Sequence, residues 1–207
     1  MDGTLLEGSA CLDLSVHAGH SELIHDLEAR WAIGQVGHVE FYELCVPLWK
    51  GLSDRDVDTV FDASRWIGGI EAVFADIRTR GEHAAVITLS PKFFAERLSR
   101  FGIETVYGAG VLPGGLVDES LVLTPDSKVT IARELLEQHG VSVDDCVAYG
   151  DSSSDVPLFA EFHNTVAVNA TDALREAAAV TYDGHDLREA YAAGRALLGR
   201  APQRGAC

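Results

Sequence analysis

Two hydrophobic rhythms divide the chain. Between residues 8 and 80, apolar side chains recur every three or four positions, as in Leu23, Ile24, Leu27 and Trp31, which predicts amphipathic helices. From residue 84 onward, short apolar runs alternate with longer amphipathic stretches. These runs cover residues 84–88, 105–107, 146–149 and 165–168. The alternation predicts buried parallel strands that are connected by helices.

The expected fold is therefore α/β, with a parallel, doubly wound sheet. Residues 8–80 carry no strand pattern, so they are interpreted as an inserted α-helical cap. The expected core consists of residues 1–7 and 81–207. A Pro-Gly-Gly turn between two apolar stretches also predicts a β-hairpin over residues 111–123. Helices are expected at residues 21–33, 70–80, 91–101, 128–139, 156–162, 172–179 and 186–198.

Composition narrows the choice of partners. The 207 residues include 32 acidic and 16 basic side chains, giving a formal net charge of −16. Such a surface repels nucleic acid and anionic lipid, so neither is an expected partner. The sequence shows no signal-peptide pattern and no apolar run of about 20 residues, and a cytoplasmic protein is expected. The four cysteines form no C-x-x-C pair and are expected to be reduced thiols.

Polar side chains with complementary chemistry lie near the predicted strand ends. Thr88 ends one strand, Asp151 and Asp155 lie in a Gly-Asp-Ser-Ser-Ser-Asp loop after another, and Lys128 begins a helix. Taken singly, each has an ordinary explanation as a helix cap, a strand-end threonine or a solvated lysine. Taken together, two carboxylates suit Mg²⁺, and a hydroxyl and an ammonium suit a phosphoryl group.

The order of these segments resembles a known family. Residues 1–5 (Met-Asp-Gly-Thr-Leu), residues 86–88 (Val-Ile-Thr), Lys128 and residues 150–155 occur in the order of the four motifs of the haloacid dehalogenase (HAD) superfamily. The helical insert stands where the phosphoserine-phosphatase-like branch carries its cap. The resemblance covers nearly the whole chain. It implies a Rossmann-like fold, Mg²⁺ as cofactor, and hydrolysis through a phosphorylated enzyme aspartate.

The resemblance also implies roles for single residues. Asp2 matches the general acid/base, Thr88 the hydroxyl that holds the phosphoryl group, and Lys128 the lysine that neutralises charge. Asp151 and Asp155 match the acidic residues of the metal loop. The expected catalytic residues are Asp2, Thr88 and Lys128, the expected metal ligands are Asp2, Asp151 and Asp155, and the expected phosphate-binding residues are Gly3, Thr4, Thr88, Leu89, Lys128 and Ser154.

One part of the first motif is missing. The nucleophilic aspartate would stand immediately before Met1, at the end of a strand that the sequence also lacks. Three explanations remain open: a start codon assigned too late, a shortened protein that has lost the chemistry, or activity with another nucleophile. Whether the chain is an enzyme is therefore left open. The leading hypothesis is a Mg²⁺-dependent phosphatase of a small phosphorylated metabolite, as a monomer or homodimer. The alternative is a non-catalytic HAD-like protein that binds a phosphorylated ligand or a protein partner.

Two positions bear on the substrate. In phosphoserine phosphatases a glutamate is expected where this chain has Ser9, and an arginine where it has Cys45. Both groups that would bind a zwitterionic amino acid are absent there, so phosphoserine is not the expected substrate. The aromatic residues of the cap are expected mostly in the core, with one or two lining a less polar pocket; they are Trp31, Phe41, Tyr42, Trp49 and Trp66.

Overall fold

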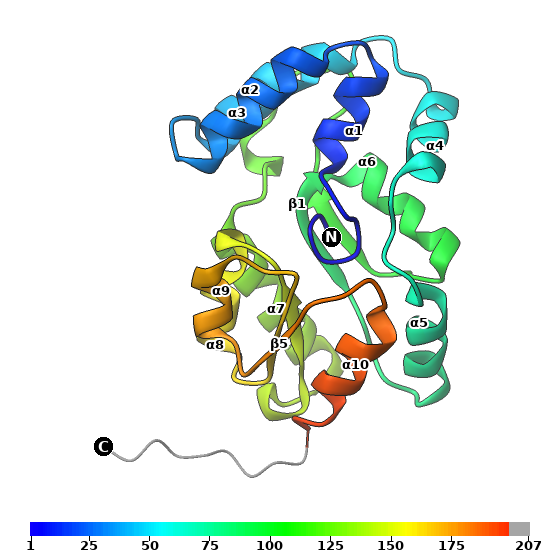
Figure 1. Ribbon diagram of the computed structural model, residues 1–207, viewed down its shortest axis with the longest axis vertical. Helices are drawn as coiled ribbons and strands as arrows, with labels where there is room; N and C mark the ends of the chain where they lie inside the picture. Colours follow the sequence, from blue (N-terminus) through cyan, green and yellow to red (C-terminus); the bar gives the residue numbers. More distant parts are fainter. Residues whose placement is uncertain (199–207) are drawn as a thin grey trace.

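The computed structural model describes residues 1–198 and confirms the α/β class. All of its strand pairings are parallel. The strands are β1 (Val86–Pro91), β2 (Val106–Ala109), β3 (Ala148–Gly150), β4 (Thr165–Val168) and β5 (Val180–Tyr182). Helices lie around these strands, and a group of helices from the first half of the chain projects beyond the end of β1 (Figure 1).

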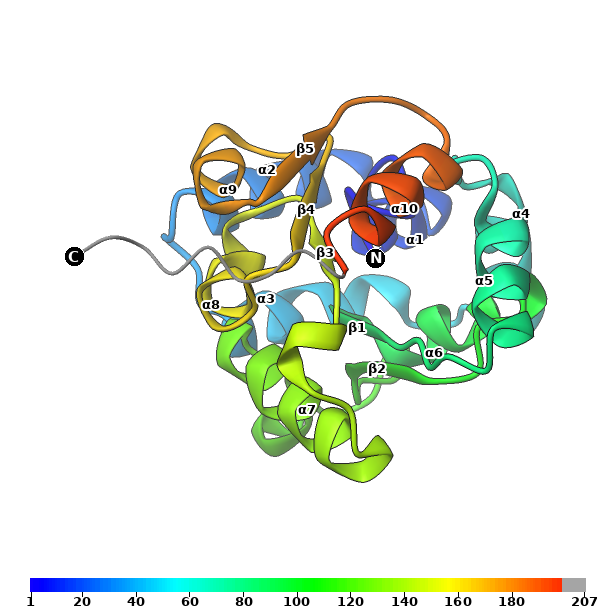
Figure 2. The same cartoon turned by 90° about the horizontal axis from the view of Figure 1, so that it is seen from below.

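The expected sheet is interrupted. β1 pairs with β2, and β3, β4 and β5 form a second sheet in that order. Within residues 1–198, no strand joins β1 to β3. Figure 2 shows the strands following one another as β5, β4, β3, β1 and β2, with the N-terminus close to the boundary between the two sheets. Residues 2–6 form a turn with an isolated bridge between Asp2 and Leu6, so they do not fill this position with a strand.

The segment expected to form the cap is helical. Ser9 caps the first helix through a hydrogen bond from the Leu12 amide, and a Ser53–Asp56 capping box begins the fourth. The fifth helix packs against α10 (Leu187–Arg195), so it also contacts the core. The five helices are α1 (Ala10–His17), α2 (Ser21–Ala32), α3 (His38–Cys45), α4 (Asp54–Ala63) and α5 (Ile70–Thr79), with a 3-10 turn, η1 (Val46–Trp49), after α3.

Helices of the core connect the strands. α7 (Pro125–His139) begins with a Thr124–Ser127 capping box and ends at Gly140 in the left-handed conformation. The helix expected over 91–101 is one α-helical turn followed by 3-10 helix. The remaining elements are α6 (Lys92–Ala95), η2 (Glu96–Phe101), η3 (Glu119–Leu121), η4 (Val143–Asp145), η5 (Ser153–Asp155), α8 (Val156–Glu161) and α9 (Asp172–Ala177).

One prediction of local structure was wrong, and one strand was not predicted. Residues 111–123 form no hairpin; they contain a turn and η3, and the apolar Leu112 and Leu116 are exposed. Val111 and Val122 are buried at the two ends of this segment, but no strands form between them, so the turn signal alone did not produce a hairpin. Conversely, β5 was not predicted, because three residues with an exposed central Thr181 carry almost no hydrophobic signal.

The largest hydrophobic cluster contains side chains from both the helical segment and the α/β core. Fully buried side chains from the helical segment, such as Trp49 and Phe61, belong to the same cluster as Phe94 and Leu98 of the core. The Trp49 indole N–H donates to Ser15 Oγ at 2.8 Å, which satisfies the one polar atom of this buried ring. The shared core holds the helices in place over the strand ends.

Two further expectations can be compared with residues 1–198. No helix in this range is long and apolar enough to cross a bilayer. Cys11, Cys45 and Cys146 are free thiols, as expected, and Cys207 lies outside the described residues.

Candidate active site

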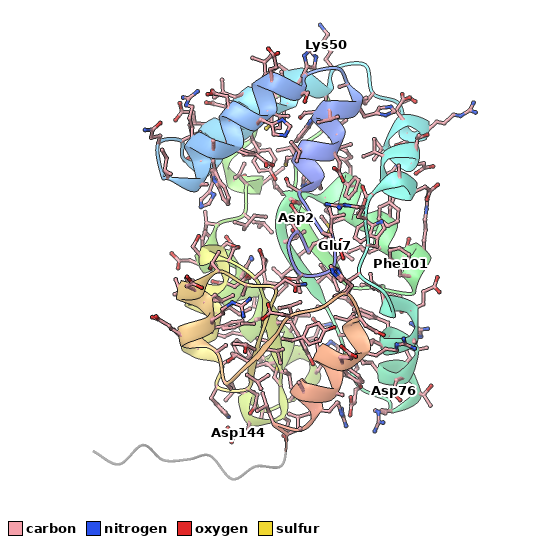
Figure 3. All side chains as sticks on the ribbon, viewed as in Figure 1. Asp2, Glu7, Lys50, Asp76, Phe101 and Asp144 are labelled. Atoms are coloured by element: carbon pink, nitrogen blue, oxygen red, sulfur yellow. The ribbon has the colours of Figure 1, made fainter. Side chains whose placement is uncertain are left out.

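The first loop places Asp2 in the interior. The Met1 carbonyl accepts hydrogen bonds from the amides of Thr4 and Leu5, at 3.2 and 2.8 Å, which folds the chain into a tight turn. Figure 3 shows Asp2 at the foot of α1, near the middle of the molecule. Asp2 Oδ2 accepts a hydrogen bond from the Ser90 hydroxyl. Asp2 Oδ1 is buried and has no hydrogen-bond partner within residues 1–198, and burial raises the pKa of this carboxyl.

Gly3 brings this turn against the loop that follows β3. Its φ is +68°, and a β-carbon at this position would lie 2.0 Å from Asp151 Oδ2. A side chain therefore cannot be accommodated without moving Asp151. The Thr4 hydroxyl also reaches Asp151 Oδ1, at 3.4 Å. The Asp2–Gly3–Thr4 turn and Asp151, which are about 150 residues apart in sequence, thus form one surface.

Asp155 holds the loop after β3 in place through hydrogen bonds to its backbone. Its Oδ2 accepts from the amides of Asp151 and Ser152, at 3.0 and 3.3 Å, and its Oδ1 accepts from Lys128 Nζ at 2.6 Å. Asp155 and Lys128 are both buried, and Lys128 Nζ also donates to Ser154 Oγ at 2.9 Å. The ammonium group is thereby fixed near the start of α7, where it faces the carboxylates of the site.

Asp151 has an unusual protonation equilibrium. Burial, assisted by the negative charge of Asp155, raises the pKa of Asp151 to about 6. The nearby Lys128 opposes this shift. The amino group of Met1 is buried near the same charges, and burial lowers its pKa. Three carboxyl groups, those of Asp2, Asp151 and Asp155, thus share a site with Lys128 and this amino group.

Thr88 and its neighbours form the wall on the β1 side. Thr88 is buried, and its Oγ1 accepts from the Ser90 amide at 3.1 Å. Ser90, which sequence reasoning missed, links Thr88 to Asp2 through its own hydroxyl. The only feature of the sequence that could have identified Ser90 as a site residue was its position two residues after Thr88 on the same strand. The Leu89 carbonyl accepts from the Tyr42 hydroxyl of α3, which ties the helical segment to this strand.

These contacts bring the predicted residues together in one connected network. It runs from Thr88 through Ser90 to Asp2, from Gly3 to Asp151, and from Asp155 to Lys128 and Ser154. Asp155, expected as a metal ligand, accepts hydrogen bonds from Lys128 and from two loop amides. No group of three or more His, Cys, Asp or Glu side chains within residues 1–198 converges on a metal position.

The remaining oxygens nevertheless fit a small hard cation. Asp2 Oδ1 is buried without a partner, and Asp151 is a crowded carboxylate with a raised pKa. Both features are relieved by a divalent cation. Mg²⁺ keeps several of its waters and is commonly bound by one or two carboxylates, so the Asp151 carboxylate together with an oxygen of Asp2 suffices.

A cavity of about 260 Å³ lies between the helical segment and the core. Ser154, which lines it, also binds Lys128, so the cavity adjoins the lysine end of the site. The Trp31 indole donates to His38 Nδ1 at 3.3 Å, which leaves a neutral His38 with its proton on Nε2. Burial, and to a smaller extent the charge of Lys128, lowers the pKa of His38. Residues on its wall include Trp31, Val36, His38, Pro125, Ser153 and Ser154.

The structure shows the surroundings of Ser9 and Cys45, the two positions that bear on the substrate. The Ser9 hydroxyl donates to Glu28 Oε1 at 2.5 Å, so a carboxylate from α2 lies where the local sequence offers only a serine. Cys45 is fully buried beside Cys11 and brings no positive charge. Neither Ser9 nor Cys45 carries a charged group itself. The structure shows a carboxylate beside Ser9.

Comparison with known proteins decides the family. The haloacid dehalogenase-like hydrolase family matches residues 1–160. The chain belongs to this family. The resemblance inferred from the four motifs is thus confirmed, as is its phosphoserine-phosphatase-like branch.

Its relatives within the HAD family are distant in sequence. A phosphoserine phosphatase of Methanocaldococcus jannaschii is 24% identical over 195 residues, which cover 91% of this chain and 92% of the relative. A phosphoserine phosphatase of Archaeoglobus fulgidus is 25% identical over 86% of the chain, which spans only 53% of that relative. A solved phosphoserine phosphatase with a phospho-aspartyl intermediate analogue superimposes with a TM-score of 0.76 at 22% identity, covering 91% of this chain and 93% of the other. A HAD family hydrolase of Salmonella enterica gives 0.81 at 17% identity, covering 97% and 70%. These structures support the fold.

Proposed function

We propose that the protein is a Mg²⁺-dependent phosphatase of a small phosphorylated metabolite other than phosphoserine. The observation that carries the proposal is the network in which Asp2, Thr88, Lys128 and Asp151 share one site. Phosphoryl transfer requires positioning and neutralisation of charge, and this network supplies both. The names of the relatives, which are phosphoserine phosphatases, support phosphate chemistry.

Lys128 and Thr88 bind the phosphoryl group in this proposal. Lys128 Nζ is buried and held by Asp155 and Ser154, so it presents its charge without a loss of side-chain freedom on binding. The Thr88 hydroxyl already accepts from the Ser90 amide, and its proton is therefore free to be donated to a phosphoryl oxygen. Mg²⁺, which the Asp151 carboxylate and the backbone carbonyl of Asp2 would hold, would supply neutralisation of phosphoryl charge and would leave the Asp2 carboxyl free to carry a proton.

Asp2 is the proton carrier of the proposal. Burial raises the pKa of its carboxyl, which favours the protonated form that a general acid needs. Asp2 then gives its proton to the leaving-group oxygen as the P–O bond breaks. In the second half of the reaction, Asp2 accepts a proton from the attacking water. The hydrogen bond from Ser90 holds Asp2 Oδ2 in position throughout.

The nucleophile is proposed to come from a strand between β1 and β3. A carboxylate at the end of such a strand would stand next to Asp2 and opposite Lys128. Its oxygen forms a bond to phosphorus while the alcohol leaves, and water later breaks that acyl phosphate to release inorganic phosphate. The interruption between the two sheets supports this placement, because it leaves one edge of β1 and one edge of β3 unpaired within residues 1–198.

The test compares three proteins in hydrolysis of p-nitrophenyl phosphate with Mg²⁺. One is this chain, the second carries a five-residue apolar strand ending in Asp directly before Met1, and the third carries the same strand ending in Asn. We expect turnover only with the Asp extension, because both extensions complete the sheet but only one supplies a nucleophile. Absence of turnover in all three contradicts the proposal.

A second candidate is a phosphate-binding protein without turnover. The interrupted sheet favours it, because no strand within residues 1–198 occupies the position between β1 and β3. Lys128, Thr88 and Asp151 would serve binding alone equally well. Binding of inorganic phosphate together with an inactive Asp extension identifies this second function.

A further inference from the structure

One peptide of β1, between Leu89 and Ser90, lies in an irregular part of the strand. The register of β1 against β2 shifts between Ile87 and Pro91, and this peptide falls within the shifted stretch. The other edge of β1 has no strand partner within residues 1–198. The orientation of the Leu89–Ser90 peptide therefore depends on side chains and not on a regular ladder of backbone hydrogen bonds.

The same peptide joins two residues of the site. The Ser90 amide donates to Thr88 Oγ1 at 3.1 Å, and the Ser90 hydroxyl donates to Asp2 Oδ2. Thr88 and Ser90 are both buried. A rotation of the peptide would therefore disturb both the Thr88 hydroxyl and the Asp2 carboxyl.

The carbonyl end of this peptide is held by Tyr42. The Tyr42 hydroxyl donates to the Leu89 carbonyl, which joins α3 of the helical segment to β1 across 47 residues of sequence. The N–H end of the peptide, which belongs to Ser90, is held by Thr88. The peptide is thus fixed at both ends, and one of the two fixing groups comes from the helical segment.

The Tyr42 side chain is itself held rigidly. It is buried, and its ring packs edge-on against the rings of Phe41 and Trp49, with centroids 5.8 and 6.3 Å away. Burial raises the pKa of the Tyr42 hydroxyl well above its usual value, so the hydroxyl keeps its proton and remains a donor. A donor fixed in this way sets the direction of the Leu89 carbonyl.

We propose that Tyr42 is a positioning residue, which holds the Leu89–Ser90 peptide so that Thr88 and Asp2 meet the phosphate group in a fixed arrangement. The inference rests on the proposed function, because that function assigns Thr88 and Asp2 to phosphate. Groups that are already held in place lose little freedom when the ligand binds, so this arrangement raises the affinity for phosphate. Tyr42 acts through the peptide and not by contact with the ligand.

Calorimetric titration with inorganic phosphate, in the presence of Mg²⁺ at pH 7.5, tests the inference without requiring turnover. Tyr42→Phe removes only the hydroxyl, keeps the ring among its aromatic neighbours, and leaves the Leu89 carbonyl without this donor. We expect the Kd for phosphate to rise by about 10-fold, as when one hydrogen bond to a charged ligand is misaligned. An unchanged Kd overturns the inference.

Two control variants separate positioning from a general loss of stability. Ser15→Ala removes the acceptor of the buried Trp49 indole within the helical segment, and Arg100→Met removes ion pairs between η2 and α4. Neither Ser15 nor Arg100 belongs to the network of the site. Both controls should therefore keep the phosphate Kd of the parent protein, while urea denaturation reports how much stability each variant loses. Weakening of phosphate binding in either control that equals the weakening in Tyr42→Phe overturns the inference.

Hydrogen exchange of the Ser90 amide, followed by NMR, is a second readout that needs no ligand. This amide donates to Thr88 Oγ1. Release of the Leu89 carbonyl in Tyr42→Phe should loosen that bond and speed exchange at Ser90 by about 5-fold, whereas Ser15→Ala should not. Exchange at Ser90 that is as slow in Tyr42→Phe as in Ser15→Ala overturns the inference.

The outcomes separate this inference from the proposed function. Phosphate binding that is equal in Tyr42→Phe and in the parent protein contradicts the role of Tyr42 alone. Failure of phosphate to bind the parent protein contradicts both proposals. Weaker binding by Tyr42→Phe than by the parent protein and the two controls, with no turnover by the Asp-extended chain, supports the role of Tyr42 and contradicts only the phosphatase reaction.

Discussion

Lys128 Nζ lies 2.6 Å from Asp155 Oδ1, and both residues are only 5% exposed. This ion pair joins the start of α7 to the loop after β3, and the same carboxylate receives two loop amides. Removing one partner of a buried pair leaves the other charge without compensation, which costs about 3–5 kcal/mol. The pair therefore holds the geometry of the site as well as presenting its cation.

The first prediction concerns this pair. We expect Lys128→Met to lower the free energy of unfolding by about 3 kcal/mol or more, because Asp155 would remain buried and unpaired. Urea denaturation measures the change. Arg133→Met is the control, since Arg133 pairs with Glu161 at the surface and such a pair contributes about 1 kcal/mol or less. Equal losses in the two variants would show that the buried pair has no special role.

A second prediction concerns the contact between Gly3 and Asp151. Gly3→Ala must tolerate both a φ of +68° and a β-carbon 2.0 Å from Asp151 Oδ2. Gly140→Ala is a matched control, because Gly140 has a φ of +64° and open space around it. We expect the control to lose about 1–2 kcal/mol from the left-handed conformation alone. Gly3→Ala should lose more, and comparable losses in urea denaturation would contradict the close contact.

The raised pKa of Asp151 predicts a specific dependence of stability on pH. A carboxyl whose folded pKa is about 6, above its unfolded value of 3.8, favours the folded state fully below pH 3.8. That contribution is lost as pH rises through 6, and about 2–3 kcal/mol is at stake. Asp151→Asn removes this dependence. We therefore expect the stability of the variant, relative to the parent protein, to increase between pH 4.5 and 7.5. A constant difference would refute the shift.

Addition of metal should act on the same carboxylate. Because Mg²⁺ binds the folded protein, it raises the free energy of unfolding by about 1.4 kcal/mol when its concentration is ten times the Kd. We expect Mg²⁺ to raise the Tm at pH 7.5 and to raise it less at pH 4.5, where Asp151 is protonated. Asp151→Asn should abolish the rise, and Asp126→Asn, at an exposed position in the first turn of α7, should retain it. A full rise in Asp151→Asn would place the metal elsewhere.

The sequence predicted the parts of the molecule that depend on periodicity and on strand ends. Parallel strands place their carboxyl ends on one edge, so the convergence of residues near 88 and 151 followed from chain order. It did not predict contacts set by packing between distant elements. Three hydrogen bonds depend on how the helices pack. They join Ser9 to Glu28, Tyr42 to Leu89, and Lys128 to Asp155. The short β5 and the false hairpin show that three-residue strands and turn motifs carry too little signal alone.

The most direct measurement is a crystal structure of the protein with Mn²⁺, as an anomalous substitute for Mg²⁺, and tungstate, as a heavy analogue of phosphate. The account predicts Mn²⁺ at Asp2 and Asp151, and tungstate within hydrogen-bond distance of Thr88 Oγ1 and Lys128 Nζ. Tungstate bound away from these two groups, or Mn²⁺ bound without Asp151, would contradict it.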